Sequence, residues 1–198
     1  MRDDDAQLVY RCMTGETDAF GDLVKRYQHS VYATAYYYVG RYGAAEDVAQ
    51  DTFLSAYRSL PRLDSPERFG PWLKEITCRM ASNWLRRNGK KLKNETPLPH
   101  KRTISLEDIR DTPGQALERE EQLARIETAI DSLPERYRLP VVLRYLQELS
   151  YQDIARFTGL THDEVKGILE RATRQLRQTL SATDEEQGGE FSWHRAQE

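Results

Sequence analysis

The chain has 198 residues, with 29 Lys and Arg against 32 Asp and Glu, and its net charge is -3. Its two cysteines, Cys12 and Cys78, lie far apart, which excludes a disulfide framework or a cysteine-rich zinc site. No apolar run approaches the ~18 residues of a membrane span, and the N-terminus does not resemble a signal peptide. We therefore expect a cytoplasmic protein without membrane insertion.

Hydrophobic residues make up 38% of the chain and charged residues 31%, which favours several small helical units over one deep core. The charge is unevenly distributed, because residues 74–102 hold nine basic and two acidic side chains, whereas acidic residues dominate 1–22 and 181–198. A basic middle between acidic ends fits a phosphate-binding patch, and it fits a solvated linker equally well.

Helical periodicity runs through most of the chain. Apolar residues recur every third or fourth position over 18–39, which predicts a long amphipathic helix. A second helix is expected over 44–60, ended by Pro61, and a third follows Pro66, with Pro71 either inside it or at its start. Because no alternating pattern typical of strands occurs, the sequence predicts an all-α protein.

The chain divides into two helical parts. After the third helix the sequence is rich in lysine, proline and glycine and has no period, which is typical of a linker. Helical periodicity then returns until about residue 180, and the acidic end contains a Gly-Gly pair, typical of a disordered tail. We therefore expect two small helical domains, at 1–88 and 116–181, with a flexible linker at 89–115 and a disordered acidic tail at 182–198.

The strongest local signal lies between 150 and 176. Ser150 with Asp153, and again Thr161 with Glu164, have the spacing of an N-terminal capping box, and Gly159 suits a tight turn between them. Two short helices joined in this way predict a helix-turn-helix, whose second helix enters the major groove of DNA; an ordinary helical hairpin is the alternative. The expected buried stripe is Val165, Ile168, Leu169, Ala172 and Leu176, and the opposite side carries His162, Asp163, Lys166, Glu170, Arg171 and Arg174.

The helix over 44–60 has a second period on the side away from its core. Asp47, Gln50, Asp51 and Leu54 recur at i, i+3, i+4 and i+7, so they share one face. An acidic face with an exposed leucine can bind a basic helix or a coiled coil, whereas the alternative is a solvated face with one stray leucine.

The third helix combines aromatic and basic side chains. Aromatic rings stack on bases and cations follow the phosphates, as expected of a protein that binds single-stranded nucleic acid. The loop at 62–65, which precedes this helix, can accept a base extruded from the duplex. Trp84 follows the apolar stripe of Ile76 and Met80, so we expect it to anchor the core instead.

Together these motifs resemble a minimal RNA polymerase sigma factor of the extracytoplasmic-function (ECF) type, over about 6–88 and 117–180. The motifs that carry the resemblance are AFGDLVKRY at 19–27, AEDVAQDTFLSAY at 45–57, FGPWLKEI at 69–76, LPER at 133–136 and LSYQDIA at 149–155. The resemblance implies a region 2 helical bundle in the first domain and a region 4 helix-turn-helix in the second, with no catalytic residue, metal or cofactor.

The resemblance also implies partners and contacts. The acidic face would dock on the β′ clamp helices of core RNA polymerase, the first domain would recognise and melt the −10 promoter element, and the helix-turn-helix would read the −35 element and touch the β flap. An anti-sigma protein is the implied regulator. The implied residues are Asp47, Gln50, Asp51 and Leu54 for polymerase; Arg62, Asp64, Ser65, Trp72, Lys74, Arg79, Arg86 and Arg87 for −10 DNA; and Thr161, His162, Lys166, Glu170, Arg171 and Arg174 for −35 DNA.

The helix that the resemblance assigns to reading DNA departs from the family pattern. Ile168 and Glu170 stand where an Arg and a His are common, and Gly167 costs ~1 kcal/mol relative to Ala inside a helix. Fewer cations weaken the contact with phosphates, although a Glu can accept a hydrogen bond from cytosine N4. The resemblance therefore implies a −35 specificity that is either unusual or weak.

Two other classes of function are the alternatives. A stand-alone helix-turn-helix regulator that binds operator DNA as a dimer explains 130–180, but it leaves the acidic face unused. An enzyme is disfavoured, since the sequence has no Gly-rich phosphate loop, no metal-spaced cluster and no nucleophile–base pair.

Overall fold

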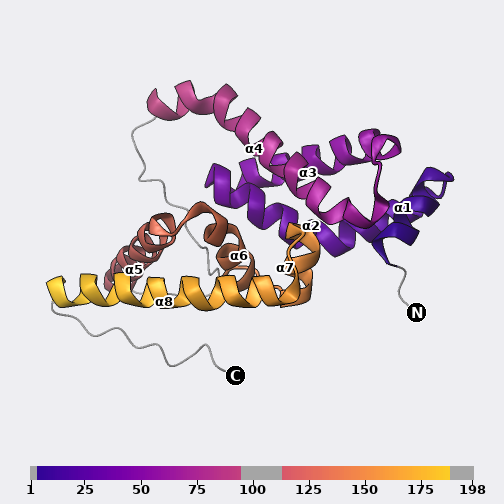
Figure 1. The fold of residues 1–198 in the computed structure, drawn as a ribbon. Coiled ribbons are helices and arrows are strands. Elements are labelled where there is room, and N and C mark those ends of the chain that lie inside the picture. Colours follow the sequence, from indigo (N-terminus) through magenta and orange to yellow (C-terminus); the bar gives the residue numbers. More distant parts are fainter. Residues whose placement is uncertain (1–3, 95–112, 188–198) are drawn as a thin grey trace.

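The computed structural model describes residues 4–94 and 113–187, and over these ranges the chain folds into helices and short connections (Figure 1). The expected all-α class is confirmed. The N-terminal part comprises α1 (Asp5–Met13), α2 (Thr17–Val39), α3 (Tyr42–Ser59), the 3₁₀ turns η1 (Leu60–Arg62) and η2 (Pro66–Arg68), and α4 (Phe69–Asn94). The C-terminal part comprises α5 (Pro113–Ser132), α6 (Glu135–Tyr145), α7 (Tyr151–Thr158) and α8 (His162–Gln187).

A short first helix, α1, precedes the helices expected from periodicity. The Asp4 carboxylate accepts a hydrogen bond from the backbone N–H of Gln7 at 2.8 Å, and the Gln7 side chain accepts one from the N–H of Asp4 at 3.1 Å. This reciprocal capping box satisfies amide groups that a helix start otherwise leaves unpaired. Leu8 and Val9 are buried and α1 packs on α2, so α1 belongs to the core of the N-terminal domain.

The N-terminal domain is assembled on α2, because α1, α3 and α4 all pack against it. α2 ends at Gly40, whose φ of 67° is in the left-handed region that glycine adopts at no steric cost. The Gly40 N–H donates to the carbonyl of Tyr36 at 2.8 Å, and α3 begins two residues later. The predicted helices over 18–39 and 44–60 therefore agree with α2 and α3 to within two residues at each end.

The helices around the expected linker and tail extend beyond the boundaries predicted for them. α4 begins at Phe69, so Pro71 lies in its first turn, where a missing N–H costs no helical hydrogen bond. α4 then continues to Asn94 and α5 begins at Pro113, so both helices extend into the segment expected to be a linker. α8 likewise runs to Gln187, past the expected start of the tail. The flexibility expected of 95–112 and the disorder expected of 188–198 lie outside the described residues.

The expected helix-turn-helix is formed by α7, Gly159 and α8. The Ser150 hydroxyl accepts from the N–H of Asp153 at 3.1 Å, and Gly159 ends α7 with a φ of 79°. Thr161 and Glu164 form the full reciprocal box, with the Thr161 N–H donating to Glu164 Oε2 at 2.7 Å and the Glu164 N–H donating to Thr161 Oγ1 at 3.2 Å. The predicted stripe faces inward: Val165, Ile168, Leu169 and Ala172 are buried, and Leu176 packs against the same core.

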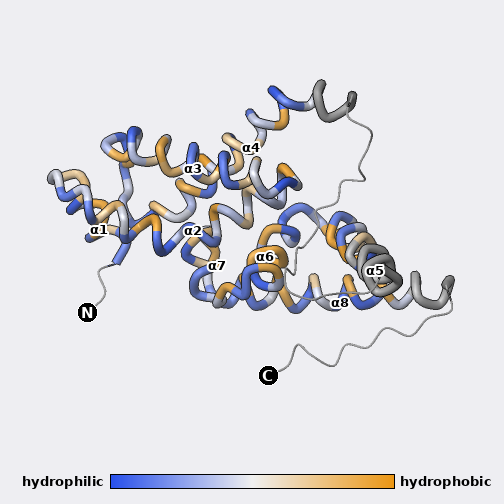
Figure 2. Tube along the Cα trace, turned by 180° about the vertical axis from the view of Figure 1, so that it is seen from behind, coloured by the Kyte–Doolittle hydropathy of each residue, from blue (hydrophilic) through white to orange (hydrophobic). Residues whose placement is uncertain are grey.

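The two domains pack against each other and share one continuous hydrophobic core. α7 lies against α4 and α2, and α6 lies against α2. The ring centroid of Tyr27 on α2 is 5.5 Å from that of Phe69 on α4 and 6.1 Å from that of Phe157 on α7. Figure 2 shows hydrophobic and hydrophilic residues alternating along the helices, as expected when each helix buries one stripe.

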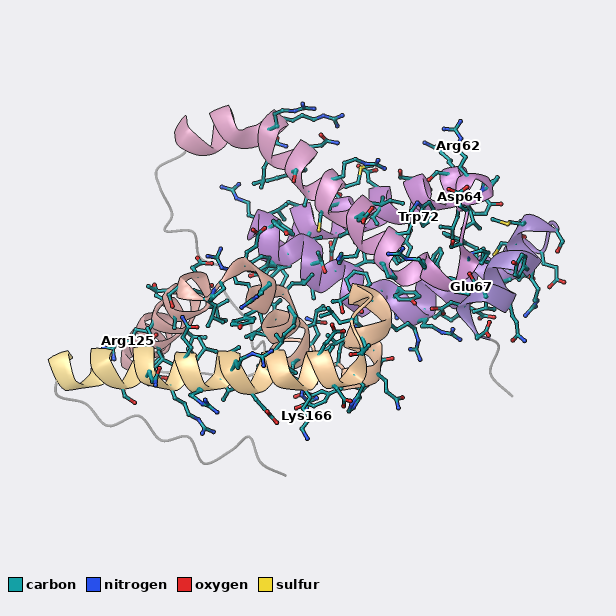
Figure 3. All side chains as sticks on the ribbon, in the orientation of Figure 1. Arg62, Asp64, Glu67, Trp72, Arg125 and Lys166 are labelled. Atoms are coloured by element: carbon teal, nitrogen blue, oxygen red, sulfur yellow. The ribbon has the colours of Figure 1, made fainter. Side chains whose placement is uncertain are left out.

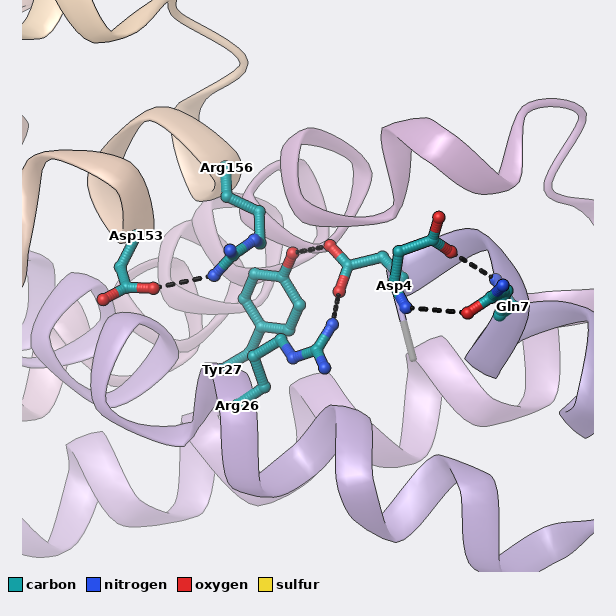
Figure 4. Close-up of polar contacts among 7 residues, drawn as sticks. Asp4, Gln7, Arg26, Tyr27, Asp153 and Arg156 are labelled. Carbon is teal, nitrogen blue, oxygen red and sulfur yellow. Dashed lines mark hydrogen bonds and ion pairs between the residues drawn. The ribbon is translucent and has the colours of Figure 1, made fainter. Parts of the chain in front are cut away.

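Tyr27 also makes a buried hydrogen bond beside this contact (Figure 4). Its hydroxyl donates to the carboxylate of Asp5, whose other oxygen accepts from the guanidinium of Arg26. The Tyr27 side chain is almost completely buried, with 2% of its surface exposed. Burial first, and then the neighbouring Asp5 carboxylate, raise the pKa of the Tyr27 phenol far above its usual range. The hydroxyl therefore stays protonated and remains a hydrogen-bond donor.

We predict that the contribution of Tyr27 to stability is lost as the pH rises above 10, because an unfolded tyrosine ionises there whereas the buried one does not. Tyr27→Phe should therefore make the fall in the free energy of unfolding between about pH 10 and 12 shallower, by roughly 1.4 kcal/mol per pH unit. Urea titrations at several pH values measure this slope. Tyr10→Phe, at a tyrosine that is 54% exposed, is the control, and an equal change in both variants would contradict the prediction.

Candidate functional site

The acidic face predicted on α3 lies on the outside of the N-terminal domain. Asp47, Gln50 and Asp51 are exposed, and 54% of the surface of Leu54 is exposed, whereas Val48 on the opposite side is buried. Within the described part of the chain, α3 packs only on α2, α4 and η1. The face is therefore open to a partner, as the sequence predicts.

Tyr57 extends this face by one helical turn beyond Leu54. Its ring is 45% exposed and stands edge-on to Phe20 of α2, with 5.0 Å between the ring centroids. The packing on Phe20 holds the exposed ring in one orientation, which lowers the entropy cost of binding through it. Sequence reasoning did not include Tyr57 in the face, although its i+3 spacing from Leu54 is the signal that could have placed it there.

Four of the residues predicted to contact −10 DNA come together around one hollow of about 290 Å³. Arg62, Asp64 and Ser65 reach it from the connection after α3, and Trp72 reaches it from α4. Figure 3 shows Arg62, Asp64 and Trp72 on the same side of the molecule. Leu63, Arg68, Pro71 and Glu75 complete the lining. The hollow therefore combines an aromatic face with hydrogen-bonding groups of both charges.

Arg68 and Glu75 are lining residues that sequence reasoning did not assign to DNA. Glu75 stands three residues after Trp72, so the helical period places both on one side of α4. Arg68 immediately precedes α4 and is exposed. Together they add a cation and a carboxylate to the hollow, and the carboxylate suits a base amino group better than a phosphate.

The other predicted −10 residues lie further along α4 or on another side of it. Lys74 is half-buried, Arg79, Arg86 and Arg87 are exposed, and none of the four lines the hollow. A row of exposed cations on a helix suits phosphates, which need charge and not a shaped pocket. Trp84 packs against a smaller cluster of buried residues from α2, α3 and α4, which includes Ala35, Val48 and Ala81, so it anchors the core as the sequence predicts.

All six residues predicted to read −35 DNA are exposed on α8 or at its start. The Thr161 hydroxyl also donates to Glu164 Oε2 at 2.9 Å. The backbone N–H of Thr161, followed by its hydroxyl, lowers the pKa of the Glu164 carboxyl. The cap therefore carries a fixed negative charge at the N-terminus of α8, where the helix dipole favours it. His162, Lys166, Glu170, Arg171 and Arg174 are the remaining exposed members of the set.

Arg171 is held by its own domain. Its guanidinium carbon is 6.0 Å from the ring centroid of Tyr137 on α6, and its Nη1 would be 3.2 Å from a Cβ added at Gly167. Gly167 therefore leaves room for the guanidinium to lie along α8. This packing gives a physical reason for a glycine that costs ~1 kcal/mol inside a helix.

The described residues form neither a metal site nor a membrane-spanning helix. Within 4–94 and 113–187, the structure shows no group of three or more His, Cys, Asp or Glu side chains placed to hold a metal ion. In the same ranges it shows no helix long and apolar enough to cross a membrane.

Family models match both domains. The model of sigma-70 region 2 matches residues 23–91, which include α3 and the hollow, and the model of sigma-70 region 4 matches residues 123–176, which include the helix-turn-helix. Together the two matches cover the elements that carry the three exposed surfaces.

Curated relatives extend the similarity to nearly the whole chain. The RNA polymerase sigma-H factor of Pseudomonas aeruginosa is 31% identical over 90% of this chain and 95% of its own length. The ECF RNA polymerase sigma-E factor of Haemophilus influenzae is 32% identical over 89% and 95%. The solved structure of CnrH in complex with the cytosolic domain of CnrY is 25% identical, covers 91% of this chain and 99% of that one, and has a TM-score of 0.55. The chain therefore belongs to the RNA polymerase sigma factors of the ECF type.

The cap at the start of α8 makes a measurable contribution to stability. We predict that Thr161→Ala lowers the free energy of unfolding by about 1 kcal/mol, because it removes an N-cap side chain. Urea unfolding followed by circular dichroism measures the change. Thr128→Ala is the control, since the exposed Thr128 hydroxyl only donates back to the carbonyl of Ala124 within α5. A loss in the control as large as in Thr161→Ala would refute a specific role of the cap.

Proposed function

We propose that this sigma factor binds core RNA polymerase through the acidic face of α3 and directs initiation at specific promoters through the hollow at α4 and the exposed side of α8. The observation that carries the proposal is the α3 face, which places two carboxylates, an amide and an exposed leucine on one open side. In this proposal the protein acts in the cytoplasm without catalysis, and an anti-sigma protein regulates it.

The chemistry of the α3 face suits a basic, helical partner. Asp47 and Asp51 are one turn apart and both exposed. Exposed carboxylates steer a cationic surface and fix its register. Leu54 and Tyr57 supply the apolar contact that binding buries. The clamp helices of the β′ subunit are the partner that family membership suggests.

The hollow beside α4 suits a single base taken out of the duplex. Trp72 is half-buried and packs on Phe69 with 5.8 Å between the ring centroids, so its position is fixed. A fixed indole can stack on a base, while Asp64 and Arg62 at the rim can accept from and donate to base edges. The exposed arginines further along α4 would follow the phosphates of the −10 element.

The exposed side of α8 suits the major groove. Lys166 and Arg174 can contact phosphates or guanines, and Glu170 between them can accept from cytosine N4. The N-terminus of α8 would point at the groove, as it does in helix-turn-helix proteins. Because Arg171 already packs on Tyr137, we assign it a smaller share of the −35 contact than Lys166 and Arg174.

The polymerase contact is tested by replacing Asp47, Gln50 and Asp51 together with alanine. All three side chains are exposed, so the variant should fold normally. We expect its affinity for core RNA polymerase to fall roughly 10-fold or more, equivalent to at least ~1.4 kcal/mol. Co-elution of the two proteins on a sizing column at moderate salt, together with a fluorescence titration, measures the change.

A matched control removes two aspartates and one glutamine elsewhere. Asp18, Asp22 and Gln28 are exposed on α2, and the contact of Asp22 with Lys25 is a surface ion pair that contributes little to stability. The control triple variant should bind polymerase like the wild type. Equal binding by both triple variants would remove the α3 assignment. No binding by the folded wild type would favour the stand-alone regulator instead.

Variants of the two tryptophans of α4 distinguish an effect on DNA binding from an effect on folding. We predict that Trp72→Ala weakens binding to a single-stranded −10 oligonucleotide by the holoenzyme roughly 5- to 100-fold, since stacking on one base contributes ~1–3 kcal/mol. Trp72→Phe should restore most of the affinity. Trp84→Ala should instead lower the urea midpoint, with little effect on DNA binding by the folded fraction. Retention of full affinity in Trp72→Ala would exclude stacking in the hollow.

A further inference from the structure

Two arginines of the C-terminal domain meet at one tyrosine, where α6 packs on α8. Arg136 Nη2 donates a hydrogen bond to the Tyr137 hydroxyl at 3.0 Å, and the Arg136 guanidinium carbon is 4.8 Å from the centroid of the Tyr137 ring. The guanidinium carbon of Arg171, on α8, is 6.0 Å from the same centroid. Two cations that are far apart in the sequence are therefore brought to one side chain, and we call them the arginine pair.

Tyr137 is a fixed support for the arginine pair. Its side chain is part of the hydrophobic core, with 7% of its surface exposed. The hydrogen bond from Arg136 lowers the pKa of the Tyr137 phenol; burial opposes this effect, and a hydrogen bond from Arg171 adds to it. A tyrosine hydroxyl is uncharged at neutral pH, so it orients the two guanidiniums without neutralising them.

Gly167 admits Arg171 to this position. A Cβ added at Gly167 would lie 3.2 Å from Nη1 and 3.3 Å from Nη2 of Arg171, which is closer than ordinary van der Waals contact. The missing side chain lets the guanidinium lie along α8 and reach the tyrosine of α6. Residues of both helices therefore build the arginine pair.

The arginine pair suits an anion. Two guanidiniums beside one hydroxyl repel each other, and an anion that contacts both removes this repulsion. The planar fork of an arginine matches the oxygens of a phosphate, so the two side chains can each donate hydrogen bonds to one phosphate group. Arg136 and Arg171 are both exposed, so a phosphate that belongs to a large molecule can reach them.

The position of the arginine pair favours the backbone of DNA. Lys166 and Arg174 are exposed on the side of α8 proposed to face DNA, whereas Ala172, next to Arg171, is buried. Arg171 therefore lies at the edge of that side, and Arg136 stands beside it on α6. When a helix lies in the major groove, which is about 12 Å wide, the two phosphate backbones pass along the edges of the helix. The arginine pair therefore lies where a backbone passes.

We propose that Arg136 and Arg171 together bind one backbone phosphate at the edge of the −35 element, and that Tyr137 is the residue that positions both guanidiniums. This inference rests on the proposed promoter function. It adds a residue of α6 to the DNA-binding surface. It also assigns Arg171 to the backbone, so the reading of bases falls to the other exposed residues of α8.

Arg136→Gln tests the phosphate contact, and Lys25→Gln, which removes an exposed cation of α2, is its control. Holoenzyme made from the full chain and core RNA polymerase is titrated with a promoter fragment that requires its −35 element. We expect Arg136→Gln to reduce the slope of log affinity against log salt by about 1, so that it loses roughly 3-fold less affinity than the wild type between about 50 and 200 mM salt. Arg136→Lys keeps the charge and should keep the slope. An unchanged slope in Arg136→Gln, or an equal change in Lys25→Gln, would overturn the proposal.

Neutral methylphosphonates identify the phosphate directly. Each one replaces a single charged phosphate in the −35 element or its flanks. At one position the replacement should weaken binding by the wild type roughly 3-fold or more, and it should have little effect on Arg136→Gln, in which the contact is already lost. Equal losses in both proteins at every position would exclude a phosphate contact and would point to an acidic protein segment as the partner of the arginine pair.

Tyr137→Phe tests whether the tyrosine positions the arginine pair. The variant keeps the ring and loses the hydroxyl that both guanidiniums approach. It should weaken promoter binding by the otherwise wild-type protein and have no further effect in the Arg136→Gln/Arg171→Gln variant, because no guanidinium is left to position. A general loss of stability would instead weaken binding in both backgrounds equally, and that result would refute the positioning role.

The proposed function and the phosphate contact fail in different ways. A wild type that does not assemble with polymerase, or whose holoenzyme is insensitive to base changes in the −35 element, would refute the proposed function. A holoenzyme that responds to those base changes, with a salt slope that Arg136→Gln leaves unchanged, would refute the phosphate contact alone.

Discussion

The packing of both domains depends on the side chain of Tyr27. Its ring lies between Phe69 of α4 and Phe157 of α7, and its hydroxyl donates to Asp5 of α1. A buried phenol must keep a hydrogen-bond partner, so the position of α1 is fixed by the same residue that joins the domains. Any movement of α7 away from α2 exposes this ring while leaving its hydrogen bond to Asp5 in place. The polar anchor of the N-terminal domain therefore lies within α1 and α2 and does not depend on α7.

The packing separates the surface proposed for polymerase from the surfaces proposed for DNA. The α3 face lies apart from the helix-turn-helix, because α3 packs only on α2, α4 and η1 within the described residues. The hollow and the start of α8 instead meet through Pro71 and Gly159.

Most residues of the candidate site were predicted from sequence patterns that act within one or two helical turns. The others are brought to the site by contacts between residues far apart in the sequence. The α3 face and the helix-turn-helix follow from helical spacing and capping residues, which act within one or two turns. α1 was missed because nine residues are too few for a clear period, although Asp4 and Gln7 have capping-box spacing. Glu75 was not assigned to DNA, and its place in the hollow depends on how the loop after α3 packs beside Trp72. No spacing rule relates Gly70 to Arg156, since their contact joins residues of different domains.

Three glycines in this protein permit close contacts that a larger side chain would block. Gly70 and Gly159 admit close approach between the domains, and Gly167 admits Arg171 along α8. A side chain at Gly70 would meet the backbone carbonyl of Arg156, so the close approach of α4 and α7 gives a physical reason for a glycine that costs up to ~1 kcal/mol inside a helix. Around this contact the rim carries polar groups, among them Arg156, His29 and Glu67. The contact between the domains therefore combines a close-fitting centre with a polar rim, and its specificity comes from shape more than from charge.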